Sequence, residues 1–102
     1  MGNREDLQLI LEAKLGSRNV YFQPPESLKI DYPAIIYSHK KYDKVYANNN
    51  KYLQRNKYSI TLVYNDPELE DVISNILDME YCTHDAHSVS NNLNHDMFTL
   101  YF

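Results

Sequence analysis

The chain has 102 residues, a length typical of one domain, and 43% of them are hydrophobic, which argues against wholesale disorder. The formal net charge of −4 argues against a generic binder of polyanions. Its single cysteine excludes an intramolecular disulfide, and no apolar run approaches the ~18 residues that a membrane-spanning helix needs. We therefore expect a soluble protein that is made in a cytoplasm and does not enter a membrane.

The charge is distributed unevenly along the chain. Residues 39–58 contain six basic side chains and one acidic side chain, a formal +5, whereas the remaining residues contain 4 basic and 13 acidic ones, a formal −9. Such an asymmetry favours either an anionic ligand or contact with an acidic patch on another copy of the chain.

The first half of the chain predicts one helix followed by two strands. Apolar residues recur at helical spacing from Leu7 to Leu15, and Gly16 is placed to end the helix. Pro24 and Pro25 end the first strand because they lack backbone donors. The predicted ranges are 4–15 for the helix, then 20–23 and 31–40 for the strands.

The second half predicts a strand, a helix and two more strands. Alternation in KYSITLVYN is typical of a strand with unequal faces. Asp66, Pro67 and Glu68 suit the cap and first turn of a helix, and Asn91-Asn92-Leu93 suits a tight turn. The predicted ranges are 57–65 for the strand, about 67–78 for the helix, and 79–90 and 94–102 for the last strands.

The element order α-β-β-β-α-β-β predicts an α+β fold. We expect a two-layer sandwich in which two amphipathic helices cover one face of a mainly antiparallel sheet. No linker divides the chain, so residues 1–102 are predicted to form a single domain. Residues 39–57 are rich in Lys, Asn and Gln, and we predict a long loop there that orders only against a partner.

Cys82, His84, His87 and His95 are residue types that bind zinc. Their spacing does not match common zinc modules, however. Strict alternation along a strand would place Cys82 and His84 on one face and His87 on the other. We therefore predict no metal site and no cofactor.

Cys82, His84 and Asp85 could also be a nucleophile, a base and a group that orients the base. Nothing in the sequence indicates a cleft for a substrate, and we expect Cys82 to pack as a small hydrophobic residue. With glycine only at Gly2 and Gly16, a glycine-rich phosphate loop is excluded. We therefore predict a protein that is not an enzyme and has no catalytic residues.

The lysines and tyrosines of residues 39–58 could bind nucleic acid through phosphate contacts and base stacking. The acidic net charge weighs against this function, and no recognised nucleic-acid module appears in the sequence. A nucleic-acid-binding module stays a less favoured alternative.

Three stretches together resemble a known group of proteins: VYFQPPESLKIDYPAIIYSHKKYDKVYANNNKY, NKYSITLVYNDPE before a helix, and LNHDMFTLYF at the end. They resemble small head–tail joining proteins of long-tailed phages. More narrowly, the chain is similar over about residues 4–102 to the tail terminator, or tail completion, proteins of siphophages. The resemblance implies the same small α+β sandwich and the same order of elements.

The resemblance also implies a function and a set of partners. Tail terminators are structural virion proteins without cofactors that assemble as a hexameric ring on the tail tube. The ring stops tube polymerisation and presents the surface that joins the head connector. The implied partners are further copies of the chain, the major tail tube protein and the head connector or head-closure protein. DNA would pass through the lumen without specific binding.

The implied location is the tail–neck junction of the virion, after assembly in the host cytoplasm. Another neck protein, such as a head-closure protein, stays an alternative. The resemblance places Y-A-N-N-N in an extended loop between two central strands. Combined with the charge pattern, it predicts an assembly loop that contains Lys40, Lys41, Tyr42, Lys44, Tyr46, Ala47, Asn48, Asn49, Asn50, Lys51, Tyr52 and Arg55.

Overall fold

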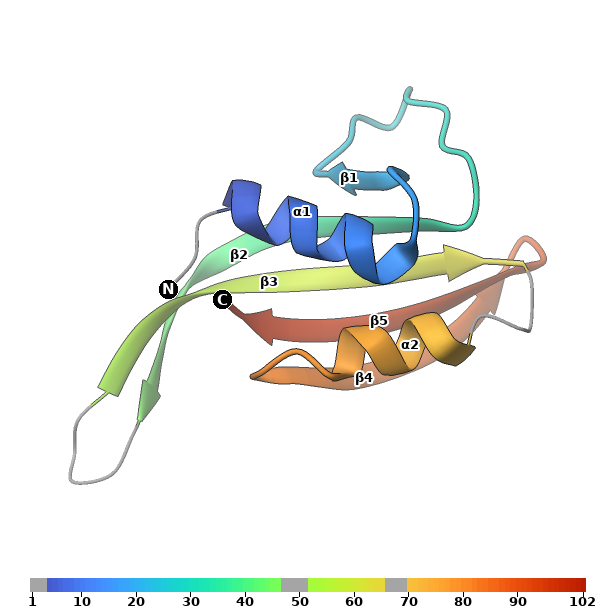
Figure 1. The fold of residues 1–102 in the computed structure, drawn as a ribbon. Coiled ribbons are helices and arrows are strands. Elements are labelled where there is room, and N and C mark those ends of the chain that lie inside the picture. The colour runs from blue at the N-terminus through green and yellow to red at the C-terminus, as the bar shows by residue number, and fades with distance from the viewer. Residues whose placement is uncertain (1–3, 47–51, 66–69) are drawn as a thin grey trace.

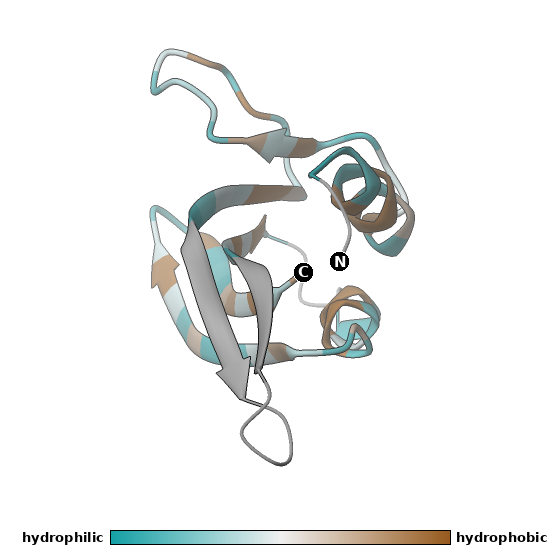
Figure 2. Ribbon diagram, turned by 90° about the vertical axis from the view of Figure 1, so that its left-hand side faces the viewer, coloured by the Kyte–Doolittle hydropathy of each residue, from teal (hydrophilic) through white to brown (hydrophobic). Residues whose placement is uncertain are grey.

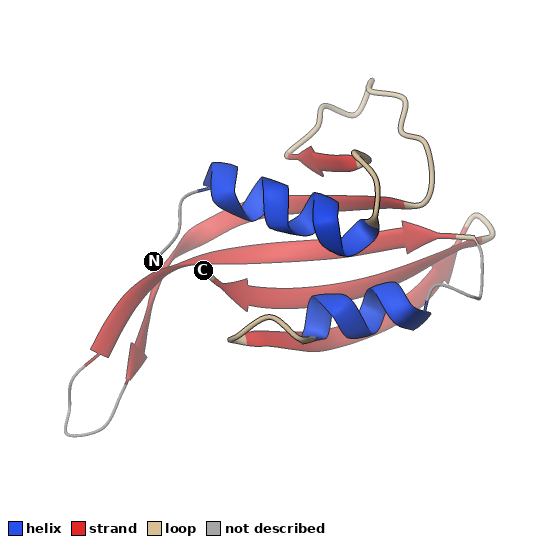
Figure 3. Ribbon diagram, viewed as in Figure 1, coloured by secondary structure: helices blue, strands red, loops and turns tan. Residues whose placement is uncertain are grey.

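The computed structural model describes residues 4–46, 52–65 and 70–102, and it describes the backbone alone for residues 41–46 and 52–56. The elements follow the predicted order (Figure 1, Figure 3). They are α1 (Arg4–Leu15), β1 (Val20–Phe22), β2 (Ala34–Tyr46), β3 (Tyr52–Tyr64), α2 (Glu70–Leu77), β4 (Cys82–Ser90) and β5 (Leu93–Tyr101).

The five strands form one mixed sheet in the order β1-β2-β3-β5-β4. β1 pairs with β2 in parallel, and the other neighbouring strands are antiparallel. Both helices lie on the same side of the sheet, which Figure 2 shows from the end of the molecule. The predicted α+β two-layer sandwich, with two helices on one face of a mainly antiparallel sheet, is therefore confirmed.

The core lies between the helices and the sheet. α1 contributes Leu7 and Leu11, and α2 contributes Val72 and Ile76. The alternation predicted for β3 is confirmed from Tyr58 to Leu62, where every second residue is buried, but Val63 on the opposite face is buried as well as Tyr64. The other buried side chains of this core are Val20, Ile35, Tyr37, Phe98 and Leu100.

α1 is fixed to the sheet by polar contacts as well as by its leucines. The Tyr37 hydroxyl donates to Gln8 Oε1 at 2.5 Å, and Gln8 Nε2 donates to the carbonyl of Val20 at 2.9 Å. The helix ends at Gly16, whose φ of +83° suits a residue without a Cβ and whose N–H donates to the Glu12 carbonyl. The predicted boundaries of this helix are confirmed.

The predicted turn between the last two strands is confirmed. Ser90 pairs with Leu93, which leaves Asn91 and Asn92 as a two-residue connection. Both asparagines have positive φ angles, 53° and 64°, as a hairpin turn matching the twist of its strands requires. Asparagine tolerates this backbone region better than most residues with a side chain.

The prediction of a long loop over residues 39–57 is wrong for 39–46 and 52–57. These residues continue β2 and β3. The two strands stay paired as far as Tyr46 and Tyr52, with one bulge along the way. Each new pair is aligned by the pair before it, so the ladder extends through polar residues. Tyrosine and valine in this stretch also favour strands.

The predicted cap and first turn of the second helix, Asp66, Pro67 and Glu68, lie outside the described residues. The described helix begins at Glu70 and ends at Leu77, which is 39% exposed.

Truncation of a central core residue tests this arrangement. Leu62 is completely buried, so Leu62→Ala should lower the free energy of unfolding by about 2–5 kcal/mol through lost burial and a cavity. Urea denaturation measures the loss. The exposed Leu28 provides the control, because Leu28→Ala should cost less than about 0.5 kcal/mol. Equal losses in the two variants would contradict the assignment of the core.

Candidate functional site

β2 and β3 extend beyond the rest of the sheet. The pairing of β3 with β5 ends at Lys57↔Tyr101, whereas β2 and β3 stay paired for five further steps, up to Tyr46↔Tyr52. We call this two-stranded extension, residues 42–46 and 52–56, the arm. Five pairs advance about 17 Å along a strand. Figure 1 shows that the arm projects past both helices.

The arm has no third strand and no covering helix in the described part of the chain. An isolated two-stranded ribbon is marginally stable in water, because it buries little apolar surface. The arm is therefore a segment whose stability a partner surface would increase.

The structure divides the predicted assembly residues into two groups. The backbone of Lys40, Lys41, Tyr42, Lys44, Tyr46, Tyr52 and Arg55 lies in β2 and β3, mostly in the arm or at its base. Ala47, Asn48, Asn49, Asn50 and Lys51 lie outside the described residues.

A β-bulge marks the base of the arm. The register with β3 shifts between His39 and Lys41, so Lys40 is the extra residue on its strand. A bulge bends a strand, increases its twist and redirects a side chain. Beside it lies a hollow of about 420 Å³ lined by Lys40, Lys57, Tyr58, Ser59 and Thr99. We call it the hollow.

The hollow presents two ammonium groups. Lys40 is exposed, and Lys57 is half-buried with its Nζ 5.8 Å from the centre of the Tyr101 ring. The Thr99 hydroxyl donates to Asp85, so the adjoining acidic group is already engaged. The described lining of the hollow therefore carries two positive charges and no negative one.

The sheet face that carries no helix has few charges. Cross-strand pairing places uncharged residues in rows across it, such as Ile36–Thr61–Met97–Ala86 and Ser38–Ser59–Thr99–Thr83. The charged residues among its described positions are Lys57 and the two bulge residues, Lys40 and Asp85. We call this surface the open face. Depletion of charge is typical of the centre of protein interfaces.

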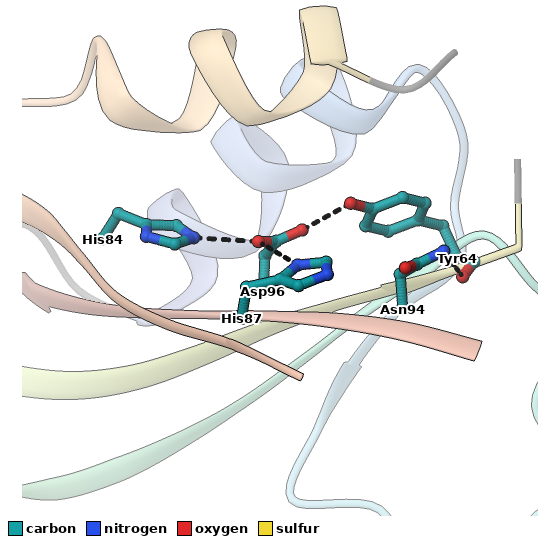
Figure 4. Close-up of polar contacts among 5 residues, drawn as sticks. All are labelled: Tyr64, His84, His87, Asn94 and Asp96. Carbon is teal, nitrogen blue, oxygen red and sulfur yellow. Dashed lines mark hydrogen bonds and ion pairs between the residues drawn. The ribbon is translucent and has the colours of Figure 1, made fainter. Parts of the chain in front are cut away.

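A second polar cluster lies on the helix-covered face. Asp96 is on the same face of β5 as Phe98 and Leu100, and its side chain is only 4% exposed. Its Oδ2 accepts a hydrogen bond from the Tyr64 hydroxyl at 2.6 Å. Its Oδ1 lies 2.8 Å from His84 Nε2 and 2.9 Å from His87 Nδ1 (Figure 4).

These contacts keep the carboxyl ionised. Burial alone would raise the pKa of Asp96, but hydrogen bonds from Tyr64, His84 and His87 outweigh it and hold the pKa below its ordinary value. A carboxylate can only accept, so both imidazole nitrogens donate to it. Burial and the contact with Asp96 raise the pKa of Tyr64 to about 12, so this phenol stays neutral.

The predicted placement of His87 on the opposite face from His84 is wrong. The register with β5 shifts between His84 and Ala86, which makes Asp85 a bulge residue. One extra residue reverses the alternation beyond it, so His84 and His87 lie on the same face. Asp96 was missed by the sequence analysis, although its position within the apolar alternation of the last strand was a usable signal.

The four residues considered as zinc ligands do not all come together. His95 pairs with Val63 on the face opposite to His84 and His87, which already contact Asp96. In the described part of the chain, no group of three or more His, Cys, Asp or Glu residues is arranged to hold a metal ion.

Cys82 packs against the core as a half-buried residue, as predicted. Burial, together with the nearby charge of Asp85, raises the pKa of its thiol to about 11. A thiol with this pKa is almost entirely protonated at neutral pH, which is the opposite of an activated nucleophile.

No known protein family matches the chain by sequence, and no curated protein is detectably similar to it. Among the described residues, no helix is long and apolar enough to span a membrane.

The buried carboxylate makes a testable contribution to stability. Asp96→Asn should lower the free energy of unfolding at pH 5 by about 1–3 kcal/mol, because it removes a charged acceptor of three hydrogen bonds. The folded pKa of Asp96 is below its ordinary 3.8, so the unfolded chain takes up this proton first on acidification. Its contribution is therefore complete above pH 5, begins to fall as pH passes 3.8 and is lost as pH falls through the lower folded pKa.

Urea denaturation of both proteins at pH 5, 4 and 3 measures this effect. The difference between wild type and Asp96→Asn should shrink as pH falls, whereas Asp31→Asn, which alters an exposed carboxyl, should change little. A difference that stays constant or grows from pH 5 to pH 3 would contradict a lowered pKa of Asp96 in the folded protein.

Proposed function

We propose that this protein is a non-enzymatic structural protein of a phage virion, a tail terminator that caps the tail tube as a ring. In this role it stops tube polymerisation and provides the surface that joins the head connector. The sequence resemblance suggests the function. The structural observation that most strongly supports this function is the arm, a paired extension of the central strands that projects from the folded body.

A ring made of one kind of subunit requires contacts between two different surfaces of the chain. The protein has such surfaces: an arm region that is basic in sequence, an open face with few charges, and a body with a formal charge of −9 outside residues 39–58. Opposite charges on different surfaces steer association and set its orientation, with an affinity that falls as salt rises.

A structural role also agrees with the chemistry of the described residues. The thiol of Cys82 is held in its protonated form, and the side chains around Asp96 satisfy one another's hydrogen bonds. The cluster of Tyr64, His84, His87 and Asp96 joins β3, β4 and β5 and so supports the fold. The proposal assigns it no catalytic role.

Electron microscopy of the purified protein, alone and mixed with a major tail tube protein, tests the proposal. Rings, or caps at the ends of tubes, are expected. A protein that stays monomeric under both conditions would contradict the proposal. A protein that binds the head connector but never the tube would instead be another neck protein.

Nucleic-acid binding by the basic arm is the rival function. Fluorescence anisotropy with labelled DNA at low salt separates the two. We expect no tight binding, because the body around the arm is acidic. Strong DNA binding that weakens steeply with salt, without ring formation, would favour the rival.

A charge reversal in the arm should impair assembly without unfolding the protein. Lys44 and Arg55 lie on the two strands of the arm, away from the core. Lys44→Glu with Arg55→Glu should leave the thermal midpoint nearly unchanged and yield overlong or unjoined tails in a phage complementation assay. Arg18→Glu with Lys29→Glu makes the same charge change at two exposed positions and should give normal tails. Normal tails from the arm variant would exclude a role for the arm.

A further inference from the structure

The sheet ends on one side at β4, which pairs only with β5. Eight of its nine residues are exposed, and no strand of the described chain lies beyond it (Figure 1). An edge strand presents unpaired backbone N–H and C=O groups that a strand from another molecule can use. The outer edge of β4 is therefore a candidate contact surface.

The turn at Asn91 and Asn92 determines which backbone groups of β4 point outward. The pair that closes a two-residue turn, here Ser90↔Leu93, is of the hydrogen-bonded kind. Hydrogen-bonded and non-hydrogen-bonded pairs alternate along an antiparallel ladder. The N–H and C=O groups of Val89 and of the residue two before it, His87, therefore point away from β5. No backbone hydrogen bond between the described elements or in their turns uses these groups.

β4 has few of the features that prevent pairing at an edge. It contains no Lys, Arg or Pro, and its one acidic residue is Asp85. The Asp85 carboxylate accepts hydrogen bonds from the hydroxyls of Thr83 and Thr99, so it is held toward β5 rather than across the edge. The bulge at Asp85 interrupts the edge, which leaves residues 86–90 as the regular stretch.

The opposite edge of the sheet is closed along the body. β1 covers β2 from Ile35 to Tyr37. The Ile35 N–H donates to the Asn19 carbonyl at 2.8 Å, and the Tyr37 carbonyl accepts the N–H of Gln23 at 2.9 Å. The His39 N–H donates to Gln23 Oε1 at 3.0 Å. The outward side of β2 is therefore occupied as far as the base of the arm.

The same alternation identifies the outward backbone groups of the arm. Ile35 and Tyr37, whose groups point outward, pair with even-numbered residues of β3. The alternation continues along β3 past the bulge, because the extra residue is on β2. The arm residues opposite even-numbered positions of β3 are Tyr42, Lys44 and Tyr46. Their N–H and C=O groups point away from β3, where the described chain has no further strand.

We propose that the β4 edge of one copy pairs with the β2 side of the arm of the next copy, so that one sheet continues between subunits. The inference rests on the proposed ring and names the contact that builds it. Val89 pairs with Tyr42, and His87 pairs with Lys44, through backbone hydrogen bonds. β1 sets this register, because a shift of β4 by two residues toward the body would place its turn against β1 and Gln23.

The strand directions suit a ring. β2 and β5 run in one direction and β3 and β4 in the other, because the three ladders that join them are antiparallel. β4 of one copy and β2 of the next are therefore antiparallel when all copies point the same way, as in a head-to-tail ring. Pairing at the arm offsets each copy along the strands, so the strands are tilted against the ring axis, as they are in closed barrels.

Charge favours this pairing over the pairing of two arms. Residues 39–58 carry a formal +5 in sequence, so two arms side by side would bring basic stretches together. β4 contributes no basic residue and one acidic residue. Pairing with β4 avoids the repulsion and supplies the third strand that a two-stranded ribbon needs for stability.

Val89→Pro tests the contact through the backbone. Proline removes the outward N–H at this position but no hydrogen bond to β5, so the protein should still fold. Self-association should weaken by about tenfold or more, because a donor is lost and the proline ring blocks close approach of the arm. Val89→Thr keeps the N–H and the branched shape and should assemble normally. The side chain is 65% exposed, so neither variant loses a buried contact.

Sedimentation velocity measures assembly, on tail tubes if wild type forms rings only there. Circular dichroism checks that the thermal midpoint of Val89→Pro stays close to that of Val89→Thr. The cross-linking experiment below keeps the contact testable if the proline variant unfolds.

Disulfide trapping measures the register independently. Ser88 and Asp43 are opposite each other between the two proposed pairs, so Ser88→Cys with Asp43→Cys, in a Cys82→Ala background, should cross-link copies under mild oxidation. Within one chain Ser88 is level with Ala34, several residues along β2 from Asp43, so each disulfide joins two copies. Ser88→Cys with Arg55→Cys is the matched control and should not cross-link, because Arg55 is on the other strand of the arm.

The outcomes separate this contact from the proposed function. If wild type forms rings and Val89→Pro assembles equally well, or the Ser88 and Asp43 positions do not cross-link, the contact is wrong and the ring stands. Dimers trapped by Ser88→Cys alone would instead assign the edge to pairing of β4 with β4. Rings of Val89→Pro that no longer cap tubes would assign it to the tube protein. If wild type is monomeric both alone and with tail tube protein, the proposed function fails, and the contact fails with it.

Discussion

The antiparallel pairing of β2 with β3 is the interaction on which the rest of the structure depends. On the body side, this ladder presents Ile35, Tyr37, Ile60 and Leu62 to the two helices, and it gives β1 and β5 their pairing edges. On the other side, the same ladder continues as the arm without a third strand. One continuous ladder therefore couples a packed core to an extension that has no core of its own. A load on the arm would be carried by hydrogen bonds that are anchored in the most buried strands.

Two β-bulges position the polar side chains of the hollow and of the cluster around Asp96. The bulge at Lys40 lies where the arm leaves the body and brings a lysine to the rim of the hollow. The bulge at Asp85 brings His84 and His87 to the same side of β4, where both donate to Asp96. β4 is an edge strand, and a bulge within it also discourages unspecific pairing with other chains. Irregularities in an otherwise regular sheet thus fix both the surface chemistry and the buried polar cluster.

A two-layer sandwich leaves one sheet face without a helix, and in this protein that face carries few charges. The charged groups lie mainly on the helices, the loops and, by sequence, in the arm. Such a division suits a subunit that presents different surfaces to different neighbours, since each surface has its own chemistry.

The sequence by itself determined the fold class, the order of the elements, the boundaries of α1 and the turn at Asn91 and Asn92, because these depend on periodicity and on local turn chemistry. The arm, the polar cluster around Asp96 and the hollow depend on tertiary structure, because they arise from contacts between strands that are far apart in the sequence. The arm was expected to be a loop, since its composition is polar, yet pairing inherited from the buried part of the ladder makes it two strands. The convergence of His84 and His87 on Asp96 required a bulge, and a one-residue shift in register leaves no trace in composition. The hollow joins three strands, so it exists only where the sheet brings them together.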